Sequence, residues 1–481
     1  MITFFASIIL LVSGYFIYSR VCEKIFVIDP QRKTPAETMA DGVDFIPMPR
    51  WKIFLIQFLN IAGLGPIFGA VAGAMWGPVA FLWIVLGCIF AGGVHDYFSG
   101  MLSLRHNGQS FSEVSGIYLG NGIRQFMRGF SVVLLIMVGT VFIMGPARIL
   151  TDLTDGFGGT VFWATLIFVY YILSTILPID KLIGKIYPVF GIALLFMAIG
   201  IMVMMIYNGL HVPELTLTSF GNQHVRPEKF PVFPMLLITI ACGAVSGFHA
   251  TQSPLMARCI RNEKQGRSIF FGAMVTEGVV ALIWAAISMS FFGGVRELND
   301  AMDAHAGNAA WAVNLISNSL LGKIGGALAI LGVIAAPITS GDTAFRSSRL
   351  IIADFLKLNQ GPVLNRLWIT IPLFVVGFLL TQVDFAIVWR YFAWTNQTLA
   401  TVVLWTITAF LIRERKFYWI SLVPAFVMTV ATVSYILVAP EGFSLPVNLS
   451  YAAGLICALA LLVPVVRTVN RQASHRLKTS G

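Results

Sequence analysis

Two aspartates lie deep inside apolar stretches of the sequence, where an ionised side chain is costly unless it is paired or hydrated. Asp96 follows His95 about eighteen residues into one such stretch. A buried acid beside a histidine can accept and release a proton, so His95 and Asp96 are candidate ion-coupling residues. The alternative is a structural polar contact between helices near the end of that stretch.

Asp342 lies in a second polar stretch, APITSGDTAFRSSR (residues 336–349). Thr339 and Ser340 add hydroxyls beside a proline and a glycine that disturb a helix, and hard cations prefer such oxygen ligands. Thr339, Ser340 and Asp342 therefore form a candidate Na⁺ site. A proton on Asp342, or an ion pair between Asp342 and Arg346, would serve the same coupling role, so Na⁺ and H⁺ both stay open.

Two glycine- and proline-containing stretches interrupt otherwise apolar runs: NIAGLGPIFGA (residues 60–70) and ACGAVSGFHATQSP (residues 241–254). In hydrocarbon each backbone N–H and C=O needs an internal partner, so a helix is interrupted where the freed groups line a cavity or bind something. The expected break residues are Gly63, Gly65 and Pro66 in the first stretch and Gly243, Gly247 and Pro254 in the second.

Interrupted helices can hold a solute, because the amide groups at a helix N-terminus attract a carboxylate. His249 and Gln252 follow the second break directly, although a single histidine is more often a packing residue. Arg390 is a weaker candidate, since its expected depth suits a structural pair with Asp384 near a membrane surface. The candidate substrate-binding residues are Asn60, Gly63, Gly65, Gly243, Ser246, Gly247, His249 and Gln252.

The composition indicates which elements must position these residues. Of 481 residues, 57% are hydrophobic and 11% are charged, which leaves too few polar side chains to cover a water-soluble globule. Apolar runs of roughly 18 residues or more predict thirteen membrane-spanning helices in an all-α polytopic protein. Their expected starts are residues 2, 51, 78, 125, 159, 187, 231, 268, 324, 364, 385, 416 and 447.

Positive charge follows the positive-inside rule under this assignment. The odd-numbered connections and the C-terminal tail hold 26 of the 32 Lys and Arg residues, and the even-numbered connections hold five. This imbalance predicts an N-terminus outside and a C-terminus in the cytoplasm. Membrane topology thus accounts for the net charge of +10, and binding to nucleic acid is not needed to explain it.

Enzyme and metal motifs are not found in the sequence. The five cysteines are scattered without metal-binding spacing, and the seven histidines are dispersed without a nucleophile or zinc motif. We therefore expect no enzyme activity and no cofactor other than a coupling Na⁺ or H⁺.

The two breaks lie in the second and seventh predicted spans, five spans apart. Five is odd, so two five-helix units would cross the membrane in opposite directions, which is typical of inverted-repeat secondary transporters. We expect an N-terminal helix and loop over 1–50, repeats over 51–210 and 231–412, and two further helices over 416–481. A polar helix over 308–321 is expected outside, as a lid or as a surface helix without a gating role.

The chain resembles the carbon starvation protein A (CstA) family in long strings spread along its length. They are NIAGLGPIFGAVAGAMWGP (60–78), GGVHDYFSGMLSLRHNGQS (92–110), ITIACGAVSGFHA (238–250), SGDTAFRSSRLIIAD (340–354) and FAWTNQTLA (392–400). The family consists of bacterial inner-membrane transporters associated with the uptake of peptides and pyruvate. The resemblance implies a LeuT-like core of five plus five helices, with one helix before it and two after it.

The LeuT-like class adds an expectation about ion binding. Its first and sixth core helices are unwound, which would be the second and seventh spans here, and its eighth core helix helps form a sodium site with the first. The resemblance therefore implies that freed carbonyls around Ile61 to Gly65, those of Ile61 and Ala62 among them, face Thr339, Ser340 or Asp342.

These features predict import of a small carboxylate-bearing nutrient, a peptide or pyruvate, by cation-coupled symport with alternating access. The alternatives are a uniporter or channel, a transporter-derived sensor, or an amino-acid symporter. The sequence predicts no oligomeric state, because lipid-facing and partner-facing apolar surfaces have the same composition.

Overall fold

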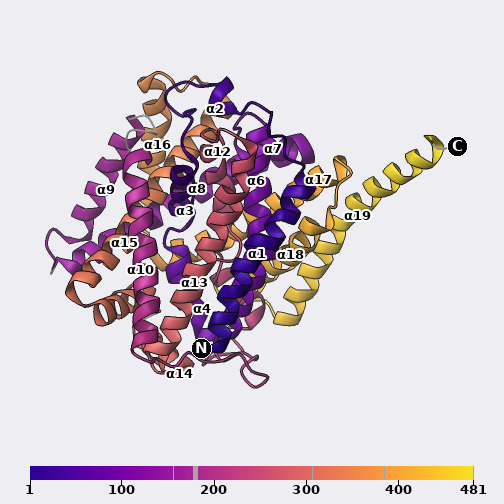
Figure 1. The fold of residues 1–481 in the computed structure, drawn as a ribbon. Helices are drawn as coiled ribbons and strands as arrows, with labels where there is room; N and C mark the ends of the chain where they lie inside the picture. The colour runs from indigo at the N-terminus through magenta and orange to yellow at the C-terminus, as the bar shows by residue number, and fades with distance from the viewer. Residues whose placement is uncertain (155, 177–182, 306, 384, 480–481) are drawn as a thin grey trace.

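The computed structural model describes residues 1–154, 156–176, 183–305, 307–383 and 385–479. All regular secondary structure over these ranges is helical, which confirms the predicted all-α class. Figure 1 shows one bundle in which the N-terminus and α14 lie at one end and α2 and α7 lie at the other. We call these the α14 end and the α2 end.

The helices follow the predicted apolar runs, with η marking a short 3₁₀ or π-helical segment. Before residue 210 they are α1 (Ile2–Phe26), α2 (Pro35–Thr38), α3 (Arg50–Ile61), η1 (Gly65–Gly69), α4 (Ala70–Gly73), η2 (Ala74–Trp76), α5 (Val79–Leu86), η3 (Gly87–Gly92), α6 (Gly93–Arg105), α7 (Phe111–Leu119), α8 (Asn121–Leu153), α9 (Gly159–Ile176) and α10 (Ile183–Tyr207). After it they are η4 (Val232–Leu236), α11 (Leu237–Thr239), α12 (Gly247–Ala257), η5 (Glu263–Gln265), η6 (Arg267–Phe271), α13 (Gly272–Phe291), α14 (Val295–Ala304), α15 (Ala309–Leu356), α16 (Val363–Leu380), α17 (Phe385–Arg413), α18 (Trp419–Val438) and α19 (Val447–Thr479).

Nine described helices are long and apolar enough to cross a membrane, or ten if the bent pair Arg50–Ile61 and Gly65–Trp76 is one span. Of the other predicted spans, the fifth is the shorter apolar stretch Gly159–Ser174, the seventh is broken between α11 and α12, and the ninth lies in α15, which is not among these nine helices. The chain is therefore a multi-pass membrane protein, and the count of thirteen spans stays a prediction, as do the boundaries of the two repeats.

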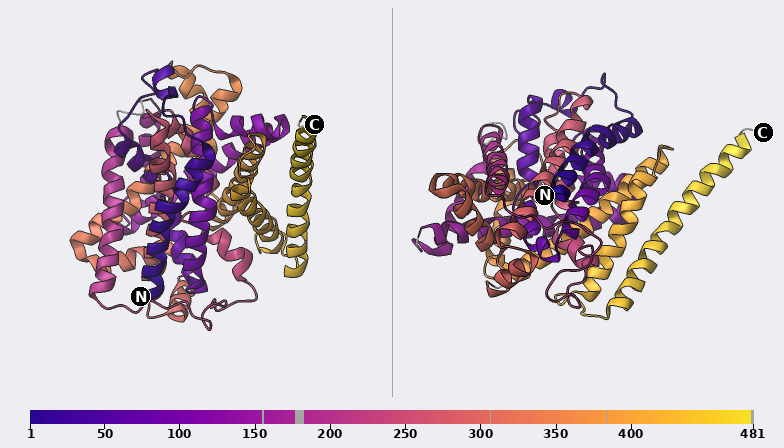
Figure 2. Two further views of the ribbon diagram at one scale, coloured as in Figure 1. Left: turned by 45° about the vertical axis from the view of Figure 1, so that its right-hand side comes forward. Right: turned by 60° about the horizontal axis from the view of Figure 1, so that its bottom comes forward.

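The interrupted helices lie inside the bundle. α3 packs against α10, α12 and α13, while α12 also contacts α6 and α17. The long helix α15 runs along α8 and α10. α19 packs mainly on α18 at the edge of the molecule, and both views of Figure 2 show it projecting away from the other helices.

The first break follows the end of α3 at Ile61. Pro66 has no N–H to donate to the carbonyl of Ala62, and Gly63 and Gly65 have little preference for a helix. The chain leaves helical geometry over 62–64 and resumes at Gly65, with a bend of 54° between Arg50–Ile61 and Gly65–Trp76. The predicted interruption of the second span is confirmed.

The second break spans residues 240–246, between α11 and α12. Gly243 has a φ of 93°, a left-handed conformation that favours glycine, and α12 then starts at Gly247 after the extended Ser246. Pro254 lies inside α12, so the expectation that it interrupts the helix is wrong. Every residue of α12 is buried, and this packing keeps the helix continuous although Pro254 removes one intrahelical hydrogen bond.

The stretch predicted as a lid is helical. α15 begins after Asn308, whose side chain accepts a hydrogen bond from the backbone of Trp311 at 3.2 Å. The helix changes direction at Gly322, where φ is 65° and ψ is −171°. Residues 309–321 therefore form a separate segment ahead of the long part of α15, and their role as a lid stays a prediction.

Candidate functional site

The two breaks pack directly against each other. A Cβ atom added at Gly65 would overlap the side chain of Cys242, and one added at Gly243 would lie 3.9 Å from the Cβ of Pro66. The glycines therefore permit an approach of the two backbones that larger side chains would prevent.

Gly65→Val is expected to lower the melting temperature of the purified protein, because the new side chain meets Cys242. Overpacking of this kind costs about 1–3 kcal/mol. The control is Gly129→Ala, since Gly129 is exposed on α8 and nothing lies within 4 Å of an added Cβ. Equal melting temperatures for the two variants in detergent would contradict the close packing of the breaks.

A pocket is lined by residues of both breaks and of α17. Gly65 and Cys242 contribute to it, together with Trp389 and the exposed Arg390. The full lining is Gly65, Gly69, Ile238, Thr239, Ala241, Cys242, Trp389, Arg390, Phe392, Ala393 and Tyr435. We call it the break pocket. The guanidinium group of Arg390 suits a carboxylate, and the aromatic and apolar walls of the pocket suit the remainder of a small organic molecule.

Four ionisable side chains beside the second break form what we call the acid–histidine cluster. They are His95 and Asp96 on α6, His249 on α12 and Glu277 on α13. The Oδ1 atom of Asp96 is 2.7 Å from Nδ1 of His95, and its Oδ2 atom is 2.9 Å from Nδ1 of His249. The Nε2 atom of His249 is 3.4 Å from Oε2 of Glu277. His249 therefore connects carboxylates from two other helices.

All four side chains of the acid–histidine cluster are 0% exposed. Burying charge is costly unless each charged group has a partner. The number of protons bound to the cluster therefore determines how many of its charges and hydrogen-bond donors are paired. The Nε2 atoms of His95 and His249 have no hydrogen-bond partner within the described residues. A proton held between His249 and Glu277 would supply a missing hydrogen bond, so the cluster is chemically suited to take up and release protons.

Cys242 links the break pocket to the acid–histidine cluster. It lines the pocket, and its Sγ atom, a ring nitrogen of His249 and a carboxylate oxygen of Glu277 lie within 4.8 Å of one another. A solute in the pocket is thus separated from the cluster by a single side chain.

The first break also presents polar groups without partners. Gln57 and Asn60 lie one turn apart on α3 and are fully buried, and the oxygen and nitrogen of both amides lack hydrogen-bond partners in the described part of the chain. The backbone amides of Gly63 and Leu64 likewise donate to no described acceptor. Unsatisfied buried donors are costly, so these groups suit a ligand that completes them.

The start of α12 is already capped. Asn396 of α17 accepts a hydrogen bond from the backbone N–H of Phe248 at 2.7 Å, and its side chain also contacts the Oγ atom of Ser246. Gln252 donates to Thr251 at 2.9 Å, which leaves the carbonyl oxygen of its side chain without a described partner. Asn396 therefore satisfies one of the backbone donors in the first turn of α12.

Ser340 reaches the first break. Its Oγ atom is 2.9 Å from the carbonyl oxygen of Leu59, in the last turn of α3. Thr339 instead donates to the carbonyl of Ala336, at 2.8 Å. Ile61 is the last residue of α3, and the N–H of Ala62 still donates to Phe58. Ser340 therefore contacts α3 at Leu59, before the carbonyls expected to face it, and the ion site at Ile61 and Ala62 stays a prediction.

Asp342 faces a different side of α15. Its Oδ2 atom accepts hydrogen bonds from Ser174 on α9, at 2.5 Å, and from Tyr187 on α10, at 2.7 Å. Arg346 forms an ion pair with Asp44 at 3.2 Å. Asp342 therefore does not join Ser340 in one set of oxygen ligands, because helix residues two apart point in different directions.

The family model described as Carbon starvation protein CstA matches residues 1–158 and 152–322, more than half of the chain. The chain belongs to the CstA family.

Three relatives illustrate the range of this family. An uncharacterized membrane protein of Haemophilus influenzae is 45% identical over 63% of this chain and 95% of its own length. The peptide transporter CstA of Bacillus subtilis is 25% identical over 89% of this chain and 88% of its own. The pyruvate/proton symporter BtsT of Escherichia coli is 28% identical over 58% of this chain and 47% of its own.

The fold is LeuT-like. The solved structure of MhsT in complex with L-phenylalanine matches with a TM-score of 0.54 over 88% of this chain and 99% of that chain, at 13% identity. This CstA-family protein is therefore a membrane transporter, not an enzyme, and its core is the predicted five-plus-five inverted repeat.

The structure brings together three predicted residues of this CstA-family protein, His95, Asp96 and His249, but adds Glu277 and Cys242, which were not predicted. The signal for Glu277 was that it is the one charged residue of α13. Arg390 was expected at a structural position, yet it lines the break pocket. Its expected partner Asp384 lies outside the described residues.

Proposed function

We propose that this protein imports a small carboxylate-bearing nutrient, a peptide or pyruvate, together with protons, by alternating access. The observation that carries this proposal is the break pocket with Arg390 at its wall and Cys242 between it and the acid–histidine cluster. Binding of a carboxylate and a change in proton number would then both act on α12, which holds His249 and follows the second break.

The substrate assignment follows from the donors in and near the break pocket. Arg390 offers a charged, planar donor group, and the N–H groups of Gly63 and Leu64 lack acceptors. The names of relatives, a peptide transporter and a pyruvate/proton symporter, agree with a substrate that carries a carboxylate. An amino acid has the same group and is the remaining alternative.

Protons are favoured over Na⁺ as the coupling ion. Four buried groups of the acid–histidine cluster can exchange protons, whereas Ser340 already donates its hydroxyl to Leu59 and Asp342 points to α9 and α10. A sodium site between α3 and α15 would need these oxygens to separate and turn toward one ion. Ser340 and the Leu59 carbonyl support Na⁺ as the second candidate.

Import requires a defined orientation of the protein in the membrane. We propose that the α14 end faces the outside of a bacterial cytoplasmic membrane and that the α2 end faces the cytoplasm, with the N-terminus outside. The distribution of Lys and Arg among the connections supports this direction.

Uptake into liposomes that contain the purified protein tests the proposal. Labelled pyruvate and labelled dialanine are supplied in parallel under a proton gradient, under a sodium gradient, and with both gradients collapsed. We expect saturable accumulation of at least one of them under the proton gradient, unchanged by a metal chelator. Uptake that persists without either gradient would indicate a uniporter or channel, and a sodium requirement would favour the Ser340 site.

Arg390→Gln is expected to raise the KM for the transported carboxylate about tenfold or more, because it removes a charge-assisted hydrogen bond worth about 1.5–3 kcal/mol. Arg296→Gln is the control, since Arg296 is exposed on α14 at the same end of the molecule. An unchanged KM in Arg390→Gln liposomes would remove Arg390 from substrate recognition.

A further inference from the structure

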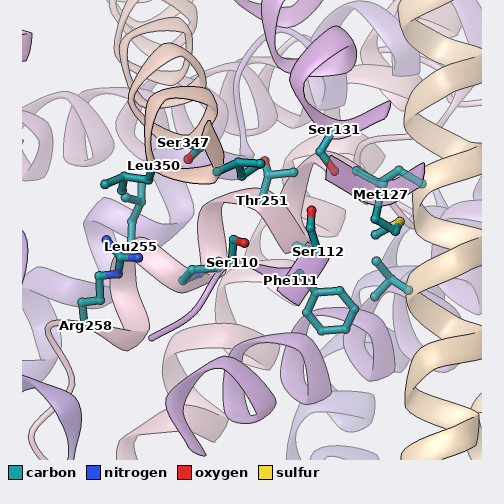
Figure 3. Close-up of a pocket in the computed structure, with 15 residues that line it drawn as sticks. Ser110, Phe111, Ser112, Met127, Ser131, Thr251, Leu255, Arg258, Ser347 and Leu350 are labelled. Carbon is teal, nitrogen blue, oxygen red and sulfur yellow. The ribbon is translucent and has the colours of Figure 1, made fainter. Parts of the chain in front are cut away.

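A second pocket, lined by six polar and nine apolar residues, lies along α12 beyond the second break. Figure 3 shows hydroxyl groups from α7, α8, α12 and α15 around it, with Arg258 at one side. The polar members of its lining are Ser110, Ser112, Ser131, Thr251, Arg258 and Ser347. We call it the serine–arginine pocket.

One face of α12 leads from the second break to this pocket. Thr251 lies one turn after Gly247, and Leu255 and Arg258 follow at helical spacing on the same face. Thr251, Pro254, Leu255 and Arg258 line the pocket. A helix of this length covers about 16 Å, so α12 runs from the region of the breaks toward the α2 end.

Several donors in the serine–arginine pocket lack acceptors. Ser112 and Ser347 are 2% and 3% exposed, and their hydroxyls have no hydrogen-bond partner within the described residues. Figure 3 shows the hydroxyl of Ser112 directed toward the space between Thr251 and Ser131. Buried hydroxyls normally have partners, so these hydroxyls suit a water molecule or a ligand that enters the pocket.

Arg258 adds a buried positive charge that is in ion-pair contact with no carboxylate of the described residues, although the carboxylates of Asp354 and Asp44 lie close enough to interact with it electrostatically. Its Nε atom donates to the carbonyl of Gly108 at 2.9 Å, and its guanidinium lies 4.9 Å from the ring of Phe45. The nearby Asp44 is held instead by Arg346 at 3.2 Å and Arg349 at 3.6 Å. Burial raises the pKa of Asp44, but these arginines hold that pKa below its ordinary value.

We propose that the serine–arginine pocket is a second anion-binding site, which receives the carboxylate of the substrate between the break pocket and the α2 end. An unpaired buried arginine is costly, and a carboxylate that bridges Arg258 and the free serine hydroxyls would remove that cost. The identity of the anion rests on the proposed function, whereas the preference for an anion rests on Arg258 and the hydroxyls alone.

The test measures charge preference in the full-length protein without using the substrate. Ser347→Cys is introduced into a Cys457→Ser background, because Cys457 is exposed and the other four cysteines are buried. Reaction with an anionic sulfonate-bearing methanethiosulfonate is compared with reaction with its cationic trimethylammonium analogue, by mass spectrometry. We expect the anionic reagent to react about tenfold faster, since a local positive charge concentrates anions.

Arg258→Gln should abolish this preference, and Arg261→Gln, at an exposed arginine of the same end, should leave it intact. Equal rates for both reagents, a preference that survives Arg258→Gln, or no labelling by either reagent would overturn the proposal. Protection from labelling by pyruvate or dialanine would identify the occupant as the substrate. Uptake by the Cys457→Ser protein is measured separately, so that a failure of the proposed transport function is distinguishable from a failure of this site.

Discussion

Asp96→Asn is expected to lower the initial rate of proton-driven uptake by about two orders of magnitude without preventing membrane insertion. Asp96 accepts hydrogen bonds from His95 at 2.7 Å and from His249 at 2.9 Å. An amide has only one acceptor oxygen and cannot be ionised, so one histidine would face an N–H donor instead of an acceptor. The measurement is uptake in liposomes of equal protein content.

Two further variants distinguish the loss of the Asp96 carboxylate charge from a structural effect of the substitution. Asp96→Glu keeps the carboxylate and should retain more activity than Asp96→Asn. Asp303→Asn changes an exposed aspartate that pairs with Arg226 at 2.5 Å, and it should transport normally. Wild-type uptake in Asp96→Asn would remove Asp96 from the mechanism and leave it as a structural contact between α6 and α12.

Glu277→Gln is expected to uncouple transport. Its carboxylate lies 3.4 Å from Nε2 of His249, and glutamine cannot receive a proton at that position. The break pocket itself is unchanged, so exchange of labelled for unlabelled substrate should continue. Accumulation against a gradient should fall by about tenfold or more, because substrate binding would no longer shift the proton equilibrium.

Exchange and accumulation must be measured on the same liposomes. Glu297→Gln, at an exposed glutamate of α14, is the matched control and should keep both activities. If Glu277→Gln loses exchange as strongly as accumulation, then Glu277 acts on the substrate or on the packing of α13, and its coupling role is wrong.

The fold was predictable because membrane insertion imposes long apolar runs, and because Gly63-Leu64-Gly65-Pro66 and Gly243 disturb two of them at corresponding places. Both breaks occur in the structure. Pro254 was assigned to the second break because proline usually ends a helix, but the packing of α12 overrides that tendency.

The site was only partly predictable, since sequence gives depth along a helix but not the direction of each side chain. Asp342 and Ser340 are two residues apart and were grouped, yet they contact different helices. Arg390 was assigned by depth to a surface pair, whereas the meeting of α17 with both breaks places it in the break pocket. Glu277 became recognisable only when α13 was seen beside His249.

The most direct test of proton coupling is substrate-evoked acidification of liposomes that contain a trapped pH-sensitive dye, with no imposed ion gradient and no sodium. Addition of the transported carboxylate should acidify the interior of wild-type liposomes in proportion to uptake, and Asp96→Asn liposomes should show neither response. Uptake by the wild-type protein with no acidification, or acidification that is equally strong in Asp96→Asn, would contradict a coupling role for the acid–histidine cluster.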